Sequence, residues 1–260
     1  MKGPLRVLRG QGGEDSPLRR GVYLLPSLLT TLNLLAGFYS ITLTLSGDFK
    51  RAAVFVLVAQ VLDVLDGRVA RLTRTTSRFG IEYDSLADLV AFGVAPAVLA
   101  YRWALVPWGD WGWLAASLYV ACGALRLARF NVQVDSVEKR SFVGLPIPAA
   151  ATVIAAVVLL YYYVGGAGAT HKQATLLLLT YALAALMVSN FRYFSFKELP
   201  FRRRQAFWML FLAILFVQVA IAIPQVVLFL AAAGYALSGP VRGLLALRRW
   251  RRQRAAKAAA

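Results

Sequence analysis

Four aspartates stand close together in the first third of the chain, at spacings that would let their side chains share a ligand. Asp63 and Asp66 are three residues apart, and Asp84 and Asp88 are four apart. Either spacing places both members of a pair on one face of a helix. The stretch between them, 73–79, is short, so we expect two antiparallel neighbouring helices with all four carboxylates at one end.

Such a cluster needs positive charge to compensate it, because four carboxylates in apolar surroundings cannot all stay ionised side by side. Oxygen ligands without a nearby His or Cys favour a hard divalent cation, Mg²⁺, Mn²⁺ or Ca²⁺, and four carboxylates leave room for two ions. Arg71 adds a planar fork suited to phosphate, and Gly67 and Gly80 would allow a ligand to approach the backbone. Salt bridges from Asp63 or Asp66 to Arg68 or Arg71 are the alternative, but they would explain one pair only.

The composition indicates where these helices lie. Of the 260 residues, 59% are hydrophobic and only 16% are charged, which excludes an ordinary soluble domain and a disordered chain. We therefore predict an all-α fold, a polytopic membrane helix bundle. The single Cys122 excludes a disulfide framework and is expected to be a small buried hydrophobe, and His171 is expected to be a solvated loop residue.

Apolar runs bounded by Gly, Pro and charged residues predict eight membrane spans. They cover residues 22–45, 52–72, 83–103, 111–129, 144–164, 174–190, 205–221 and 225–237. The last two are separated only by a short stretch around Pro224, so one broken segment is the competing interpretation there.

The formal charge of +17 is explained by topology. If the N-terminus is cytoplasmic, only Lys50, Arg51, Arg102 and Lys172 of the 29 Lys and Arg residues fall on the outer side, as the positive-inside rule expects. Both termini and the aspartates are then cytoplasmic. The first 20 residues lack an apolar run and are read as a lead-in rather than a signal peptide. The basic tail, 241–260, is expected to bind anionic lipid headgroups rather than nucleic acid.

The stretch DVLDGRVARLTRTTSRFGIEYDSLAD, residues 63–88, resembles a family signature. It fits the pattern DxxDGxxAR(x)8GxxxDxxxD of the CDP-alcohol phosphatidyltransferases at every fixed position. Members of that family are membrane enzymes with a six-helix core, usually homodimeric, that transfer a phosphatidyl group from a CDP-lipid to an alcohol and release CMP. The resemblance implies a catalytic core over residues 21–199, with two further helices in 200–240.

The resemblance also implies roles for individual residues. Asp63, Asp66 and Asp84 would hold two metal ions, and Asp88 would touch the second ion and take the proton from the attacking hydroxyl. Gly67, Arg71 and Ser77 would hold the CDP group. The family's first helix often carries PNxxTxxR. The matching run here begins at Pro26, so Thr30 and Asn33 are expected to contact the nucleotide, although Ser27 and Asn33 depart from the pattern.

Further stretches resemble the branch of the family that uses serine, the integral-membrane phosphatidylserine synthases of bacteria and archaea. They are LPSLLTTLNLLAGFYSI, GALRLARFNV, FVGLPIPAAA and LMVSNFRYFSFKEL. The implied substrates are L-serine and CDP-diacylglycerol or an archaeal CDP-lipid. A zwitterionic acceptor needs a cation for its carboxylate. The candidates are Arg126, Arg129, Asn131, Lys139, Arg140 and Arg192, and ordinary positive-inside charge is the competing explanation for the basic ones.

Three questions stay open at this point. An isolated aspartate is a weak base for an alcohol, so Asp88 needs either greater basicity from its neighbours or a hydroxyl acidified by metal. A sister enzyme that uses glycerol 3-phosphate or an inositol phosphate would carry the same signature. A cation transporter could also place carboxylates in a membrane, but it has no use for Gly67, Ala70, Arg71 and Gly80 at fixed spacing.

Overall fold

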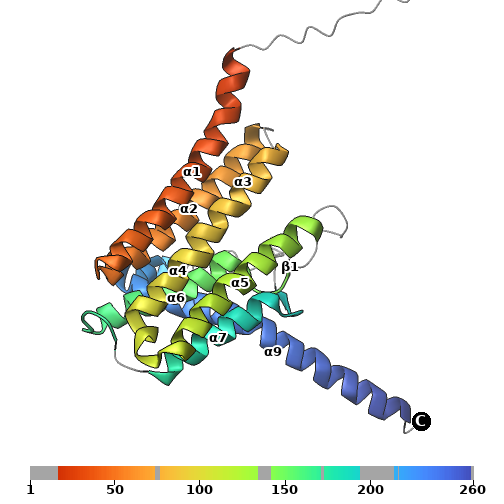
Figure 1. Cartoon of the computed structure of the whole chain (residues 1–260). Helices are drawn as coiled ribbons and strands as arrows, with labels where there is room; N and C mark the ends of the chain where they lie inside the picture. The colour runs from red at the N-terminus through yellow and green to blue at the C-terminus, as the bar shows by residue number, and fades with distance from the viewer. Residues whose placement is uncertain are drawn as a thin grey trace, which may run out of the picture.

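The computed structural model describes residues 17–73, 77–133, 142–170, 173–193, 214–215 and 217–258, and this part of the chain is almost entirely helical, as expected (Figure 1). The helices follow one another as α1 (Pro17–Leu45), α2 (Phe49–Thr73), α3 (Arg78–Asp88), η1 (Leu89–Val94), α4 (Ala95–Ala100), η2 (Tyr101–Leu105), η3 (Val106–Trp108), α5 (Asp110–Gln133), α6 (Ile147–Tyr163), α7 (Ala174–Val188) and α9 (Pro224–Ala258).

Most of the predicted spans coincide with these helices. Among the described residues, four segments are long and apolar enough to cross a membrane: Pro26–Leu45, Arg78–Trp108, Asp110–Val132 and Pro224–Gly243, while Ile147–Tyr163 and Ala174–Val188 are shorter apolar helices. α2 carries Asp63, Asp66, Arg68 and Arg71 in its second half and is not among the four. The predicted span 205–221 lies largely outside the described residues, so the total of eight spans stays a prediction.

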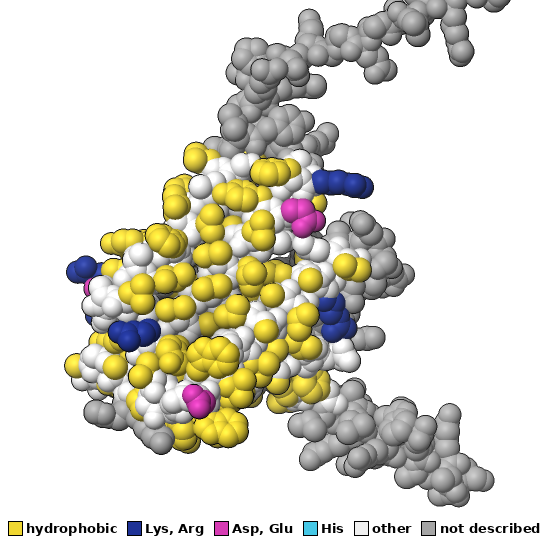
Figure 2. Space-filling view, viewed as in Figure 1, with side chains coloured by type: hydrophobic (Ala, Val, Ile, Leu, Met, Phe, Trp, Pro, Cys, Tyr) yellow, Lys and Arg dark blue, Asp and Glu magenta, His cyan; other side chains and the backbone are white. Residues whose placement is uncertain are grey.

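The surface agrees with a membrane environment. Figure 2 shows one face on which hydrophobic side chains form a nearly continuous cover, with charged side chains at its margins. On α1 alone, Leu28, Leu35 and Phe38 are 56%, 53% and 58% exposed. An apolar surface of this extent would be unstable in water. The chain is therefore a multi-pass membrane protein with a helix-bundle fold.

The third predicted span, 83–103, is longer in the structure and begins earlier. Ser77 is the N-cap of α3, and its Oγ accepts a hydrogen bond of 3.0 Å from the backbone N–H of Gly80, which starts the helix at Arg78. The segment then continues through η1, α4, η2 and η3 to Trp108. Asp84 and Asp88 consequently lie within a helix rather than at its first residues.

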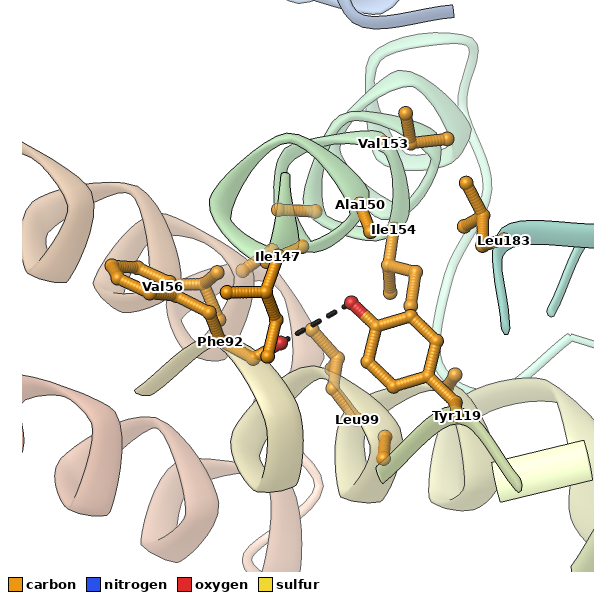
Figure 3. Close-up of a cluster of buried hydrophobic side chains, with 14 of the residues drawn as sticks. Val56, Phe92, Leu99, Tyr119, Ile147, Ala150, Val153, Ile154 and Leu183 are labelled. Atoms are coloured by element: carbon orange, nitrogen blue, oxygen red, sulfur yellow. Dashed lines mark hydrogen bonds between the residues drawn. The ribbon is translucent and has the colours of Figure 1, made fainter. Parts of the chain in front are cut away.

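A π-helical stretch, η1, follows Asp88 directly. Pro96 has no N–H to donate to the carbonyl of Phe92, four residues earlier. The N–H of Ala95 instead reaches the carbonyl of Val90, five residues back, and the hydroxyl of Tyr119 on α5 donates to the Phe92 carbonyl at 3.2 Å (Figure 3). The irregular turn is thus stabilised by a neighbouring helix.

Buried apolar side chains from four segments surround this hydrogen bond. Val56 of α2, Phe92 of η1, Tyr119 of α5 and Ile147 of α6 are each fully buried, and Figure 3 shows them converging. Since every one of these helices contributes to a single core, the position of η1, and with it Asp88, is fixed relative to α2.

Small residues allow the helices to approach closely around η1. A Cβ added to Gly37 of α1 would lie 2.6 Å from the Cα of Ala91, and one added to Gly123 of α5 would lie 2.7 Å from Cδ1 of Ile147. The contact at Gly37 is with backbone and leaves no room for a side chain, whereas a side chain at Gly123 would require the end of Ile147 to shift. Backbone contact at small residues is a common way for helices to pack in membranes.

A short strand pair connects two loops at the end of the bundle that holds the aspartates. β1 (Phe142–Val143) pairs antiparallel with β2 (Arg192–Tyr193), and the N–H of Gly144 donates to the carbonyl of Phe191 at 2.9 Å. Gly144 has φ of 81°, a conformation that favours glycine. The segments that follow α5 and α7 are held together by this pair.

The close crossing at Gly37 gives a prediction about stability. We expect Gly37→Ala to destabilise the protein by about 1–3 kcal/mol, because the new methyl group overpacks the contact with Ala91. Gly234→Ala is the matched control: it is also a helical glycine, but nothing lies within 4 Å of its added Cβ. Thermal unfolding in detergent should show a lower Tm for the first variant only. Equal Tm values would contradict the close crossing.

Candidate active site

Three of the four aspartates converge on one point. One carboxylate oxygen each from Asp63 and Asp66 of α2 and Asp84 of α3 lie within 4.8 Å of one another. Asp63 and Asp66 form no salt bridge with Arg68 or Arg71, all four of which the structure describes, so the alternative raised from sequence is not observed. Three close carboxylates without such partners repel one another, and a cation between them or protonation of a carboxyl group would relieve this repulsion.

The donor set fits a hard divalent cation. All three donors are carboxylate oxygens, the ligand type that Mg²⁺, Mn²⁺ and Ca²⁺ prefer. Oδ1 of Asp84 is buried and has no hydrogen-bond partner among the described residues, whereas buried polar atoms are normally satisfied. A metal ligand position would account for this atom.

α1 holds Asp66 from the other side. Oγ1 of Thr30 lies 2.9 Å from Oδ2 of Asp66 and 3.1 Å from the carbonyl of Pro26, so its single proton is available to either oxygen. Thr30 and Asp66 are 5% and 3% exposed. A buried hydroxyl of this kind orients a carboxylate without competing for the metal-facing oxygen.

Asp88 lies one helical turn beyond Asp84 and outside the group of three. The side-chain amide of Asn33 donates to its Oδ1 at 3.2 Å. Asn33 is fully buried and does not line the cavity described next. The structure thus places Asn33, which was expected to contact the nucleotide, against Asp88.

A cavity of about 390 Å³ opens beside the three carboxylates. It exists because α2 packs closely on η1 and α4 but hardly on α3, so that the two helices separate toward this end. Its walls come from three helices: Pro26, Ser27 and Thr30 of α1, Asp66, Gly67, Ala70 and Arg71 of α2, and Ser77, Phe79, Gly80, Ile81 and Asp84 at the start of α3.

Four of the five residues predicted to bind the CDP group line this cavity: Thr30, Gly67, Arg71 and Ser77. A Cβ on Gly67 would lie 3.7 Å from Nη1 of Arg71, so the absence of a side chain leaves the guanidinium accessible from the cavity. Ser77 contributes its N-cap turn to the opposite wall. A guanidinium beside a carboxylate cluster suits a diphosphate whose charge is shared with metal ions.

Two aromatic residues that sequence reasoning did not single out lie on α3, and one of them, Phe79, lines the cavity. The rings of Phe79 and Tyr83 stack with centroids 5.8 Å apart and an interplanar angle of 13°. The hydroxyls of Tyr83 and Thr31 lie 2.9 Å apart and share a hydrogen bond in which either can donate, and Thr31 Oγ1 also lies 2.7 Å from the carbonyl of Ser27. The four-residue spacing of Phe79 and Tyr83 places both rings on one helical face, and this spacing was the sequence signal that could have identified the pair.

The candidates for acceptor binding occupy different positions. Arg126 of α5 is within electrostatic range of Asp88, and its guanidinium carbon lies 5.7 Å from the ring centroid of Phe130. Arg129 instead donates to Oδ1 of Asn190 at 3.0 Å, and Asn131 donates to Oγ of Ser85 at 2.9 Å. Asn190 is a further residue that the sequence did not suggest.

Three other candidates are not placed by the structure. Lys139 and Arg140 lie outside the described residues. The backbone of Arg192 belongs to β2, but its side chain is not described. Of the six acceptor-binding candidates, Arg126 interacts electrostatically with Asp88 and Asn131 contacts Ser85 on the helix that carries Asp88.

Comparison with known proteins assigns this site to a family. The profile of the CDP-alcohol phosphatidyltransferases matches residues 23–230, which include all four aspartates, the cavity and most of the helices. The chain belongs to the CDP-alcohol phosphatidyltransferase family. This family uses a divalent metal, which agrees with the donor set of Asp63, Asp66 and Asp84.

Relatives within the family carry more specific names. The chain is 40% identical over 198 residues to a CDP-diacylglycerol–serine O-phosphatidyltransferase of Helicobacter pylori, covering 76% of this chain and 83% of that protein. It is 46% identical over 140 residues to the enzyme of the same name from Mycobacterium leprae, covering 51% and 46%. It is also 45% identical over 129 residues to an archaetidylserine synthase of Methanothermobacter thermautotrophicus, covering 49% and 54%.

The hydrogen bond from Thr30 gives a prediction about metal dependence. Thr30→Val should raise the Mg²⁺ concentration needed for half-maximal thermal stabilisation and activity by about tenfold, because loss of an outer-shell partner weakens the ligand it orients. Thr44→Val is the control, since Thr44 is a buried residue of the same helix whose hydroxyl donates only to the Ser40 carbonyl. The same Mg²⁺ dependence in both variants would show that Thr30 does not support the metal site.

Proposed function

We propose that this protein transfers the phosphatidyl group of CDP-diacylglycerol to the hydroxyl of L-serine, giving phosphatidylserine and CMP. The observation that carries the reaction class is the convergence of Asp63, Asp66 and Asp84 beside a cavity lined by Gly67 and Arg71. The choice of serine rests on the names of the relatives, one of which is matched over 83% of its length.

Two divalent ions, Mg²⁺ or Mn²⁺, are proposed for the site, with Ca²⁺ as a weaker candidate. Asp63, Asp66 and Asp84 would hold them, and Asp88 would contact the second. When bound, such ions neutralise charge on the diphosphate as the bond to CMP breaks. The ligands thus come from α2 and α3, and Thr30 of α1 keeps Asp66 oriented.

The chain's own residues supply the remaining steps. Arg71 and the N-terminal turn of α3 at Ser77 bind the CDP group in the cavity, and Thr30 borders it from α1. Asp88 accepts the proton of the attacking hydroxyl, and the amide of Asn33, donating to Oδ1 of Asp88, leaves Oδ2 to do so. Asn33 thereby positions the base and acts on the nucleotide only indirectly.

The two substrates would occupy opposite sides of the carboxylates. The cavity lies on the side of Asp66 and Asp84, whereas Asp88 and Arg126 are not among its lining residues. Phosphoryl transfer needs the attacking and leaving oxygens roughly in line. A serine bound near Arg126, with its hydroxyl toward Asp88, would approach from the side opposite CMP. Arg129, Asn131, Lys139, Arg140 and Arg192 remain secondary candidates for acceptor binding.

The cellular setting is also proposed. The distribution of Lys and Arg supports an enzyme of the cytoplasmic membrane with both termini and the active site on the cytoplasmic side. The basic tail would bind anionic lipids there, and the family resemblance supports a homodimer. The proposed organisation is a lead-in at 1–20, a core at 21–199, additional helices in 200–240 and the tail at 241–260.

An acceptor screen tests the proposed function. Purified protein with CDP-diacylglycerol and Mg²⁺ or Mn²⁺ should release CMP on addition of L-serine, with far less release for glycerol 3-phosphate, an inositol phosphate or no acceptor. Release with one of the phosphorylated acceptors alone would identify a sister enzyme. Metal flux through vesicles without CMP release would contradict the enzyme assignment altogether.

The proposed base gives a prediction of its own. Asp88→Asn should lower serine-dependent turnover by at least about a hundredfold, the usual contribution of a general base, while the protein still folds and binds CDP-diacylglycerol. Asp48→Asn is the control, because Asp48 pairs with Arg51 in the turn at the other end of α2. Near-normal turnover of the first variant would remove Asp88 from the base role.

A further inference from the structure

Arg126 faces the C-terminal helix as well as the metal site. The phenol of Tyr235 on α9 and the carboxylate of Asp88 both lie within electrostatic range of its guanidinium. Nε of Arg126 is buried and has no hydrogen-bond partner among the described residues. A guanidinium with an unused N–H is suited to bind a carboxylate through two parallel hydrogen bonds.

α9 is held in a fixed position beside this guanidinium by β2. The hydroxyl of the buried Tyr193 donates to the carbonyl of Ala236 at 3.1 Å, and its ring centroid is 5.5 Å from that of Tyr235. The ring lies so close to Gly239 that no side chain would fit there. Tyr193 thus contacts Ala236 and Gly239 at the two ends of one turn of α9 and fixes the orientation of Tyr235.

A second aromatic residue fixes the next turn of α9. A Cβ on Gly243 would lie 2.6 Å from the ring of Phe191, and the carbonyl of Phe191 accepts the N–H of Gly144. Gly239 and Gly243 are four residues apart, so both aromatic contacts fall on one face of α9. α9 also packs along α6. Its register relative to α5 is therefore set by the strand pair that joins the loops after α5 and α7.

We propose that Tyr235 is a specificity-determining residue that completes the acceptor subsite with Arg126. The Arg126 guanidinium and the Tyr235 hydroxyl would both donate to the carboxylate of the amino-acid acceptor, whose own hydroxyl then points toward Asp88. This inference rests on the proposed function. It makes the C-terminal helix, which lies outside the motif-bearing core, part of the active site.

The chemistry explains why both residues are needed. A carboxylate has lone pairs for about four hydrogen bonds, and Arg126 alone uses two of them. An alcohol without a carboxylate, such as serinol, would lose both partners and leave the guanidinium unpaired. A site with two donors aimed at one anionic group therefore selects an amino acid over a simple amino alcohol.

The test is Tyr235→Phe, which removes one hydroxyl and keeps the ring that packs against Tyr193. We expect KM for serine to rise about tenfold, as loss of one hydrogen bond to a charged group implies. KM for CDP-diacylglycerol and Tm should stay unchanged. The preference for serine over serinol in kcat/KM should fall by a similar factor. Arg126→Lys, which keeps the charge but loses the fork, should show the same acceptor-specific loss.

Tyr181→Phe is the matched control, because its hydroxyl donates to the carbonyl of Trp111 at the far end of the bundle; it should leave both KM values unchanged. An unchanged serine KM in Tyr235→Phe would overturn the inference. So would an equal rise in both KM values accompanied by a lower Tm, which indicates a structural role. If the wild-type protein releases no CMP with serine, the proposed function itself fails, and that result is distinct from these.

Discussion

The mutual repulsion of three neighbouring carboxylates, of which Asp66 is buried and Asp63 and Asp84 are partly buried, is the constraint on which this structure depends. Asp63, Asp66 and Asp84 approach within 4.8 Å at the point where α2 and α3 separate. Without a cation, such an arrangement would cost several kcal/mol in apolar surroundings. A divalent cation bound between the carboxylates would turn this repulsion into an attraction between the two helices, because it would contact both of them. The cavity lies next to the carboxylates and is lined by residues of both helices.

The rest of the bundle keeps this costly arrangement in place. The backbones of α1 and η1 touch at Gly37 and Ala91, so α1 can present Thr30 to Asp66 and Asn33 to Asp88. The π-helical turn after Asp88 is fixed by Tyr119. The hydroxyl of Tyr119 donates to the carbonyl of Phe92, to which Pro96 has no N–H to donate. The close packing below the site thus keeps the carboxylates in position where the helices separate. They would need little rearrangement to bind a metal ion.

The sequence predicted what depends on short-range spacing. The aspartate pairs, Gly67 and Arg71 could be found because their chemistry follows from residue type and helical periodicity, and the helices agree with most of the predicted spans. It could not predict what depends on tertiary contacts. Asn33 stands where the pattern PNxxTxxR has its Arg and was therefore expected to contact the nucleotide, but its amide donates to Asp88, because α1 crosses close to η1. The start of α3 could not be predicted from the apolar run, because it depends on the capping hydrogen bond of Ser77. Tyr235 could not be identified from sequence, because Arg126 lies 109 positions away.

The central claim is that these carboxylates form a divalent metal site against which the nucleotide binds. A crystal of the protein grown with Mn²⁺ and CDP, examined by anomalous scattering at the manganese edge, tests it directly. We predict anomalous density between the carboxylates of Asp63, Asp66 and Asp84, with the diphosphate of CDP next to it in the cavity lined by Gly67 and Arg71. Density for CDP in the cavity with no manganese among the three carboxylates, or manganese bound only elsewhere, would contradict the account.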